Sequence, residues 1–433
     1  MNTYEKYRDS GVQWIGEIPS HWDTIRIKDT GFLYGGLTGK SGDDFRDEGN
    51  PTNRPFIPFT NIFRNTYISP DNFGMVVIND GENQNRVQKN DLFFLMSSED
   101  YEDLGKTSIL VHDYDELYLN SFCKGLRITN EEVYPLFLNY QLSGYTHKKL
   151  ISVEGSGFTR INLRQDKLTN TPVLLPPLPE QHQIVSFLDE KSSLIDDLIN
   201  KKEQKIGLLK EYRTSLINRV ITKGLNPDCP MKDSGVEWIG MIPSHWDVRK
   251  LKYGVSHIVE KGQPSSSDVK ISPENIESGT GRCLSLYSDY EGEGFEFHQG
   301  DVLLNKLRLY LKKIYLTTSD GYSMGEMIVL RPIDGLMNNK YLFNTLFHQG
   351  LIDLLDSQSN GVKLPRVSPD VIINTDVMYP PLPEQEQIVS FLDEKTGEID
   401  RTIQSEQKKI ELLKEYRQSL ISTVITGKIK VVN

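Results

Sequence analysis

The chain contains two long sequence elements that each occur twice, with different spacing. Residues 9–23 read DSGVQWIGEIPSHWD and residues 233–247 read DSGVEWIGMIPSHWD, a match at 13 of 15 positions. Residues 176–191 read PPLPEQHQIVSFLDEK and residues 380–395 read PPLPEQEQIVSFLDEK, a match at 15 of 16 positions. The first offset is 224 residues and the second is 204, so the inserts between the elements differ in length by 20 residues. This pattern predicts two similar but unequal modules within one repeated frame.

Length and composition are compatible with such a chain. Its 433 residues suffice for two or three domains, and a hydrophobic content of 37% with 25% charged residues is typical of a globular protein. No apolar run approaches the roughly 18 residues of a membrane span, and the polar start MNTYEKYRDS does not resemble a signal peptide. We therefore expect a cytoplasmic protein, with reduced thiols at the widely spaced Cys123, Cys229 and Cys283.

A helix is predicted to begin at each PPLPEQ element. Prolines suit the first helical turn, and the glutamate that follows complements the helix dipole. Seam positions then recur at spacings of three and four over about 43 residues, which is the pattern of a coiled coil. In the first helix they include Ile195, Ile199, Lys202, Ile206 and Leu209; in the second they include Ile399, Ile403, Glu406, Ile410 and Leu413.

The two helices are predicted to pair with each other. So narrow a seam needs a helical partner, and the alternative is that each helix packs separately on its neighbouring module. Two copies joined through a globular insert most simply lie antiparallel. Equivalent residues then meet only at the midpoint, so Lys202 and Glu406 are expected to approach each other across the seam.

The two inserts are predicted to be mixed α+β modules. Each contains short apolar or alternating runs broken by Gly, Pro, Asn and Asp, followed by a helical stretch near residues 134–150 or 339–355. We therefore divide the chain into a frame element, a first insert, a first long helix, a linker with the repeated frame element, a second insert and a second long helix, at residues 1–23, 24–175, 176–224, 225–247, 248–379 and 380–433.

Few residues suggest catalysis. A GKS at residues 39–41 lacks the earlier glycine of a phosphate-binding loop, and the Pro-Pro pairs lack the polar residue that an adenine methyltransferase requires. His21 and His245 stand in identical PSHW contexts without a nucleophile or base nearby. We interpret these histidines, which stand beside Trp22 and Trp246, together with Trp14 and Trp238 as packed joints between frame and insert.

The strongest signal for nucleic-acid recognition is NKLRLYLKK at residues 305–313. On a strand, Lys306, Arg308, Tyr310 and Lys312 would share one face, which would offer charge for phosphates, a guanidinium for guanine and an aromatic platform. A solvated strand face is the alternative. Alignment of Asp91 with Asp301 places Ser98 opposite Arg308, and acidic residues follow Ser98, so the two inserts are predicted to present different chemistry at this position.

Weaker candidates for DNA contact lie in other loops. Two short glycine-bearing loops contain Lys40 in the first insert and Lys261 with Gln263 in the second. Near the end of the inserts, Gly157 matches Gly361, and the basic residues that follow are Arg160, Lys363 and Arg366. The net charge of −11 argues against a protein that coats nucleic acid, but not against a reader with basic groups on one face.

The frame as a whole resembles the specificity subunit of type I restriction-modification systems. The resemblance is carried by DSGVxWIGxIPSHW, PPLPEQxQIVSFLDEK and LLKEYRxSLI, each present twice around two variable inserts. It implies two target-recognition domains, each reading one half of a bipartite, asymmetric DNA site. It also implies that the two helices form an antiparallel coiled coil that sets the spacer between the half-sites.

The resemblance also implies which functions lie on other chains. Adenine methylation and DNA cleavage would belong to modification subunits, two of them expected, and to restriction subunits. S-adenosylmethionine, ATP and Mg²⁺ would then bind those partners, and this chain would be non-catalytic and need no cofactor or metal. Two alternatives stay open: a methylation-only complex without a nuclease, and a coiled-coil interaction scaffold without DNA specificity.

Overall fold

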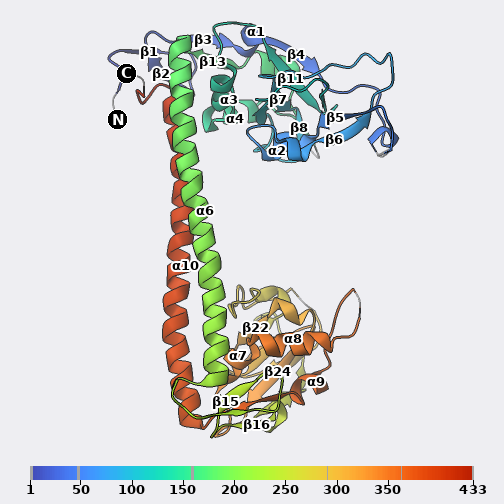
Figure 1. The fold of residues 1–433 in the computed structure, drawn as a ribbon, viewed down its shortest axis with the longest axis vertical. Coiled ribbons are helices and arrows are strands. Elements are labelled where there is room, and N and C mark those ends of the chain that lie inside the picture. Colours follow the sequence, from blue (N-terminus) through green and yellow to red (C-terminus); the bar gives the residue numbers. More distant parts are fainter. Residues whose placement is uncertain (1–2, 46–48, 158–159, 290, 362, 432–433) are drawn as a thin grey trace. The chain divides into compact units, whose positions relative to one another are not determined.

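The computed structural model describes residues 3–45, 49–157, 160–289, 291–361 and 363–431. The chain divides into two compact units (Figure 1). Unit 1 comprises Met1–Lys201 and Lys409–Asn433, and unit 2 comprises Lys202–Lys408. Each unit contains one globular domain, called domain 1 or domain 2 below, and part of both long helices. Among the described residues, no helix has the length and apolar character needed to cross a membrane.

Domain 1 is built on a four-stranded antiparallel sheet. Its order is β4–β11–β7–β9, with bounds Gly31–Gly35, Cys123–Ile128, Leu92–Leu95 and Thr107–Ile109. Both faces of the sheet are buried, because Leu92 and Phe94 enter one apolar core while Phe93 and Leu95 enter another. The helices that accompany it are α1, α2, α3, α4 and α5, at Ile27–Thr30, Phe59–Arg64, Pro135–Ser143, Tyr145–Ser152 and Gln165–Thr169.

Smaller strand pairs complete domain 1. A second sheet has the order β10–β5–β6 and contains Tyr118–Leu119, Asn53–Ile57 and Gly74–Val77. Three two-stranded pairs are β1 with β2, β3 with β13 and β8 with β12, at Tyr7–Asp9 with Glu17–Pro19, Asp23–Arg26 with Pro172–Leu175, and Ser97–Ser98 with Ile161–Asn162. Short 3₁₀ turns η1 and η2 lie at Asp43–Phe45 and Pro70–Asn72.

Domain 2 has the same main sheet. Its order is β17–β24–β21–β22, with bounds Val255–Ile258, Met327–Pro332, Val302–Asn305 and Ile314–Leu316. A second sheet, β18–β20–β23–β19, contains Lys261–Gly262, Gly294–Phe297, Gly321–Ser323 and Lys270–Ile271. The strand pairs β14 with β15 and β16 with β25 lie at Met231–Asp233 with Met241–Pro243, and Asp247–Lys250 with Asp376–Tyr379.

The helices of domain 2 are α7, α8 and α9, at Asn339–Leu346, Gln349–Ser357 and Pro369–Ile373. Its 3₁₀ turns η3, η4 and η5 are at Leu251–Tyr253, Pro273–Asn275 and Leu309–Leu311. Both domains also contain the same ion pair between a half-buried arginine of the main sheet and a buried aspartate, Arg127 with Asp91 and Arg331 with Asp301, each at 2.8 Å. The internal repeat therefore extends into the inserts, although their sequences differ.

The repeated PPLPEQ element joins each long helix to its domain. Helix α6 spans Leu178–Lys223 and helix α10 spans Leu382–Ile425, so both begin where the sequence predicted. The fully buried Gln181 amide accepts a hydrogen bond from the backbone N–H of Tyr134 at 2.8 Å and donates to Glu132 and Pro176. Gln385 makes the same three contacts, with Asn338, Leu336 and Pro380.

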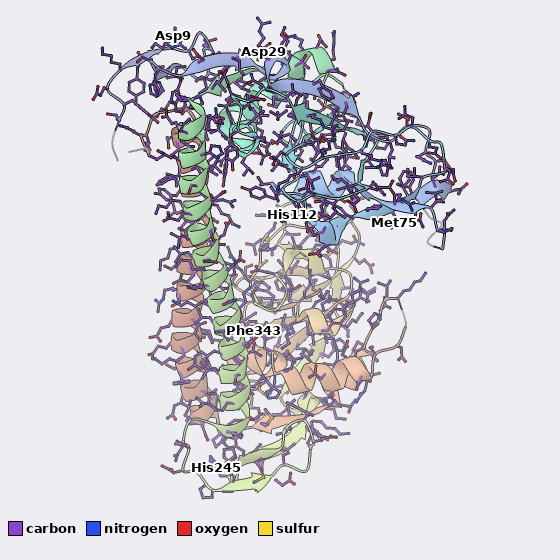
Figure 2. The ribbon with its side chains drawn as sticks, turned by 45° about the horizontal axis from the view of Figure 1, so that its top comes forward. Asp9, Asp29, Met75, His112, His245 and Phe343 are labelled. Carbon is purple, nitrogen blue, oxygen red and sulfur yellow. The ribbon has the colours of Figure 1, made fainter. Side chains whose placement is uncertain are left out.

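The histidine of each PSHW element contacts the glutamate that precedes this glutamine in the long helix, Glu180 in α6 or Glu384 in α10. His21 Nε2 lies 2.9 Å from Glu180 Oε2, and His245 Nε2 lies 2.8 Å from Glu384 Oε2. His245 belongs to the loop after β15 (Figure 2). The histidines predicted as packed joints are bound to these glutamates but their side chains are 48% exposed, whereas the neighbouring Trp22 and Trp246 are fully buried.

The same prediction is wrong for Trp14. Its side chain is 55% exposed, because the repeated element turns back on itself and buries Ile15 in place of the tryptophan. Trp238 is half-buried against His348, with ring centroids 5.1 Å apart. The two copies of this frame tryptophan therefore have different surroundings.

The two long helices pack together in both units, as the seam predicted (Figure 1). In unit 1, Ile195, Ile199 and Ile410 are buried and Asp196 pairs with Arg417 at 3.0 Å. In unit 2, Ile206, Ile399 and Ile403 are buried and Asp400 pairs with Arg213 at 3.1 Å. Each ion pair is the 204-residue counterpart of the other, which is what an antiparallel pairing of equivalent helices requires. Leu209 and Leu413 are half-buried.

The predicted midpoint contact is present. Lys202 Nζ lies 2.7 Å from Glu406 Oε2, and Lys205 Nζ lies 3.0 Å from Glu406 Oε1. The Glu406 side chain is 6% exposed and that of Lys202 is 24% exposed. A buried carboxylate that needs cationic partners disfavours shifted registers, in which it would face isoleucine.

Glu406→Gln is expected to lower the free energy of unfolding by about 1–3 kcal/mol, because it leaves two lysines without their buried counter-charge. Chemical denaturation followed by far-UV circular dichroism measures the change. Glu415→Gln, at an exposed position on the same helix, is the control and should change it by less than about 0.5 kcal/mol. Equal effects of the two substitutions would show that Glu406 does not fix the register.

Candidate nucleic-acid interface

The segment with the strongest recognition signal is not a strand, which corrects the sequence prediction. Strand β21 ends at Asn305, and the residues that follow form a turn with the 3₁₀ segment η5. The Asn305 side chain closes this turn, since Nδ2 donates to the carbonyl of Leu307 at 2.8 Å and Oδ1 accepts from its N–H at 3.1 Å. Lys306, Arg308, Tyr310 and Lys312 therefore do not share one face of a strand.

The alternation of leucines with polar residues predicted a strand, but only one of the three leucines is buried in the core. Leu309 is 2% exposed, while Leu307 and Leu311 are half-buried. On either side of η5 the backbone is left-handed, with φ of 52° at Arg308 and 47° at Lys312. A pattern of period two cannot distinguish a strand from a turn of this kind.

This turn pairs with the segment near the end of the insert that contains the weaker basic candidates. Leu307 bridges to Arg366, the N–H of Arg308 donates to the carbonyl of Pro365 at 2.9 Å, and that of Val367 donates to the carbonyl of Lys306 at 3.0 Å. Two segments that the sequence suggested separately are therefore adjacent. We call residues 305–312 and 365–367 the paired segments of domain 2.

Domain 1 has the same pairing in the same register. Ser97 pairs with Asn162 and Ser98 with Ile161, and the N–H of Leu163 donates to the carbonyl of Met96 at 2.8 Å. Residues 95–102 and 161–163 are the paired segments of domain 1. The register makes Ser98 the counterpart of Arg308 and confirms the alignment from Asp91 to Asp301.

In domain 2, three basic residues of the paired segments already have partners within the protein. Glu326 binds both Arg366 and Lys306, the latter at 3.5 Å. Lys312 Nζ donates to the carbonyl of Phe347 at 3.1 Å, and burial lowers the pKa of Lys312. These three residues are therefore placed to hold the loops together.

Arg308, Tyr310 and Lys363 are different. Each is exposed, Tyr310 at 52%, and within the described part of the chain none has a side-chain ion pair or hydrogen bond. An unpaired guanidinium, an aromatic ring and an ammonium group lie in loops of the same domain. This combination suits contact with base edges and phosphates.

The paired segments of domain 1 carry the opposite charge. Glu99, Asp100 and Glu102 follow Ser98 and are exposed, and Ser98 Oγ accepts from the N–H of Asp100 at 3.2 Å. The nearest predicted basic residue, Arg160, lies with its guanidinium carbon 5.7 Å from the ring centroid of Phe122. Phe122, which is 59% exposed, and Glu326 are not among the residues that the sequence predicted for this interface. Neither stands in a motif, so only the fold identifies them.

The lysines predicted in the two glycine-bearing loops are engaged with carboxylates, and Lys261 belongs to strand β18 and not to a loop. Lys40 Nζ lies 2.6 Å from Glu82 Oε2, and the Lys40 side chain is only 5% exposed. The hydrogen bond from Lys40 is the main reason that the pKa of Glu82 is lowered to about 2. Lys261 is exposed and pairs with Glu293 at 3.2 Å, while Gln263 is exposed on the neighbouring loop.

Comparison with known proteins identifies the family of this fold. A sequence profile described as "Type I restriction modification DNA specificity domain" matches residues 19–208 and 243–415. The chain belongs to this family. The two matches cover both repeats, which agrees with the doubled frame and with DNA-sequence recognition as the function of the chain.

Individual relatives in the specificity-subunit family are distant in sequence but cover most of the chain. The Escherichia coli type I restriction enzyme EcoDI specificity subunit is 23% identical over 315 residues, which are 68% of this chain and 70% of that protein. The putative MjaX specificity subunit of Methanocaldococcus jannaschii is 23% identical over 449 residues, 96% of each protein.

Solved structures show the same fold. One chain of a structure titled for complex assembly and conformational transition of the type I R-M system has a TM-score of 0.70 at 14% identity, and the match covers 95% of this chain and 99% of that one. The crystal structure of the HsdS subunit from Thermoanaerobacter tengcongensis has a TM-score of 0.55 at 15% identity and covers 95% and 98%. The two-domain, coiled-coil fold predicted for this specificity subunit is therefore confirmed.

Among the loop lysines, we expect Lys363→Ala to weaken DNA binding and Lys40→Ala to leave it within about twofold. An exposed lysine near a phosphate releases a counterion on binding, so Lys363→Ala should also reduce the slope of log affinity against log salt by roughly one. The measurement is binding of the subunit, assembled with its partner subunits, to duplex DNA at several salt concentrations. A larger effect of Lys40→Ala would mean that its pair with Glu82 opens on binding.

Proposed function

We propose that this chain is the DNA-reading and assembly subunit of a type I restriction-modification complex. Each domain reads one half of a bipartite, asymmetric site, and the antiparallel coiled coil sets the spacer. The observation that carries the proposal is that two copies of one fold present opposite charge at the same paired segments. Unequal surfaces on equivalent scaffolds are suited to unequal half-sites.

The covalent chemistry is assigned to other chains. Modification subunits methylate adenine N6 with S-adenosylmethionine, and restriction subunits use ATP and Mg²⁺ to translocate and cleave. This subunit supplies sequence selection and a frame on which those chains assemble. A net charge of −11 supports this division, because partners must then provide much of the phosphate contact.

Two equivalent surfaces on the coiled coil are suited to two modification subunits. Leu208 and Tyr212 are 65% and 57% exposed on α6 in unit 2, and their counterparts Leu412 and Tyr416 are both 50% exposed on α10 in unit 1. Leucine and tyrosine one turn apart on an exposed helix face are typical of a protein interface. Because the same two residues recur at the 204-residue offset, we propose one modification subunit for each.

Replacing Leu208 and Tyr212 together by alanine is expected to release one of two modification subunits, because it removes one apolar surface and leaves its counterpart intact. Native mass spectrometry of the purified complex measures the stoichiometry. Tyr287→Ala, at a residue of domain 2 that is 61% exposed, is the matched control and should retain both subunits. Retention of both subunits by the double variant would exclude this surface.

Genome-wide mapping of methylated adenine tests the proposed function itself. Deleting the gene should abolish methylation at one bipartite motif, and expressing the chain again should restore it. A complex that contains no translocase-sized subunit would favour the methylation-only alternative. Unchanged methylation after deletion, with equal binding of the complex to random and specific duplexes, would favour the interaction scaffold and contradict the proposal.

A further inference from the structure

We propose that Arg308 is the guanine-reading residue of domain 2, presented to the major groove by the paired segments 305–312 and 365–367. The inference rests on the proposed function and adds a residue, a base and a domain to it. Arginine binds O6 and N7 of guanine through two parallel N–H donors, which is the commonest specific contact to a base edge. The ligand of this site is therefore a guanine within duplex DNA.

The backbone around Arg308 is the first argument. Among the described residues, only Asn90, Arg308 and Lys312 have positive φ without being glycine. Asparagine tolerates this conformation, but for arginine and lysine it costs free energy that the surrounding structure must supply. Two such residues flank a single turn of 3₁₀ helix, and the turn is held by buried Leu309 and by the bond from Arg308 N–H to Pro365.

The charges around Arg308 are the second argument. Neighbouring Lys306 and Arg366 share Glu326, and Lys312 donates to a backbone carbonyl. Arg308 alone among the basic residues of the paired segments has no side-chain partner in the described structure. A guanidinium whose backbone is fixed and whose tip has no partner is available to a ligand, since binding need not break an internal ion pair.

The counterpart in domain 1 is the third argument. Ser98 occupies the position of Arg308, is buried, and is followed by exposed Glu99 and Asp100. Carboxylates only accept hydrogen bonds, so they cannot bind the acceptor edge of guanine and instead suit the amino group of cytosine. Guanine selection through this position is therefore confined to the half-site that domain 2 reads.

Three variants separate the role of the side chain from the role of the backbone. Arg308→Gly removes the guanidinium and suits positive φ, so the turn should fold at least as well as in the native chain. Arg308→Lys keeps the charge but loses the paired donors. Arg249→Lys is the matched control, because Arg249 is an exposed arginine of strand β16 in domain 2, lies outside the paired segments and pairs with Asp247 at 2.6 Å.

The experiment measures binding of the assembled methyltransferase complex to duplexes in which each base pair of the methylated motif is replaced in turn. The native complex should prefer guanine at least about tenfold at one position of one half-site. Arg308→Gly and Arg308→Lys should reduce this preference to under about threefold and leave the other half-site unchanged. Arg249→Lys should leave all preferences unchanged.

Each remaining outcome overturns the inference. A half-site of domain 2 without a guanine preference, an unchanged preference in Arg308→Gly, or complete loss of binding by that variant while it still assembles would each exclude a guanine reader at this residue. These failures leave the proposed function intact, because the native complex would still methylate a bipartite motif. Failure of the proposed function is recognised separately, by the absence of any motif that depends on the gene.

Discussion

The antiparallel register of the two long helices is the constraint on which the rest of the molecule depends. Apolar seam residues bury the helices against each other, but isoleucines repeated every three or four residues would tolerate a shift by one heptad. Glu406 removes this tolerance, because its buried carboxylate meets Lys202 and Lys205 in one register only. Two equivalent ion pairs favour the same register, one in each unit: Asp196–Arg417 in unit 1 and Asp400–Arg213 in unit 2.

A fixed register is useful only if each domain is rigidly attached to its helix, and the repeated motifs serve this purpose. Gln181 and Gln385 use a buried amide to bind the backbone that begins the helical part of the insert. Glu180 and Glu384 bind the histidines of the PSHW element. A buried amide leaves costly unsatisfied groups if any partner moves, so these joints resist rotation. The PPLPEQ and PSHW motifs therefore serve to join each domain to its long helix.

The sequence predicted the frame well and the local structure around the candidate DNA contacts poorly, for one physical reason. The helix seams follow from the heptad spacing of apolar residues, and the Lys202–Glu406 contact follows from the repeat of the helix 204 residues later. Both can be read directly from the sequence. The turn at Arg308 depends instead on Asn305, on the burial of Leu309 and on a partner segment some sixty residues later, so its alternation gave the wrong structure. Lys40 likewise gave no sign that Glu82 would bury its charge. An ion pair between residues far apart in the chain cannot be predicted from the spacing of residues in a motif.

The same neutralisation explains how an acidic chain reads DNA. Glu82, Glu293 and Glu326 bind lysines and arginines that would otherwise attract any phosphate. Sequence-independent affinity grows with the number of free cations, whereas discrimination depends on the few groups that reach base edges. A subunit whose lysines and arginines are partly engaged in this way gains less affinity for random DNA. In the complex proposed above, the partner subunits supply affinity for the duplex, and the contacts of this chain choose between sequences.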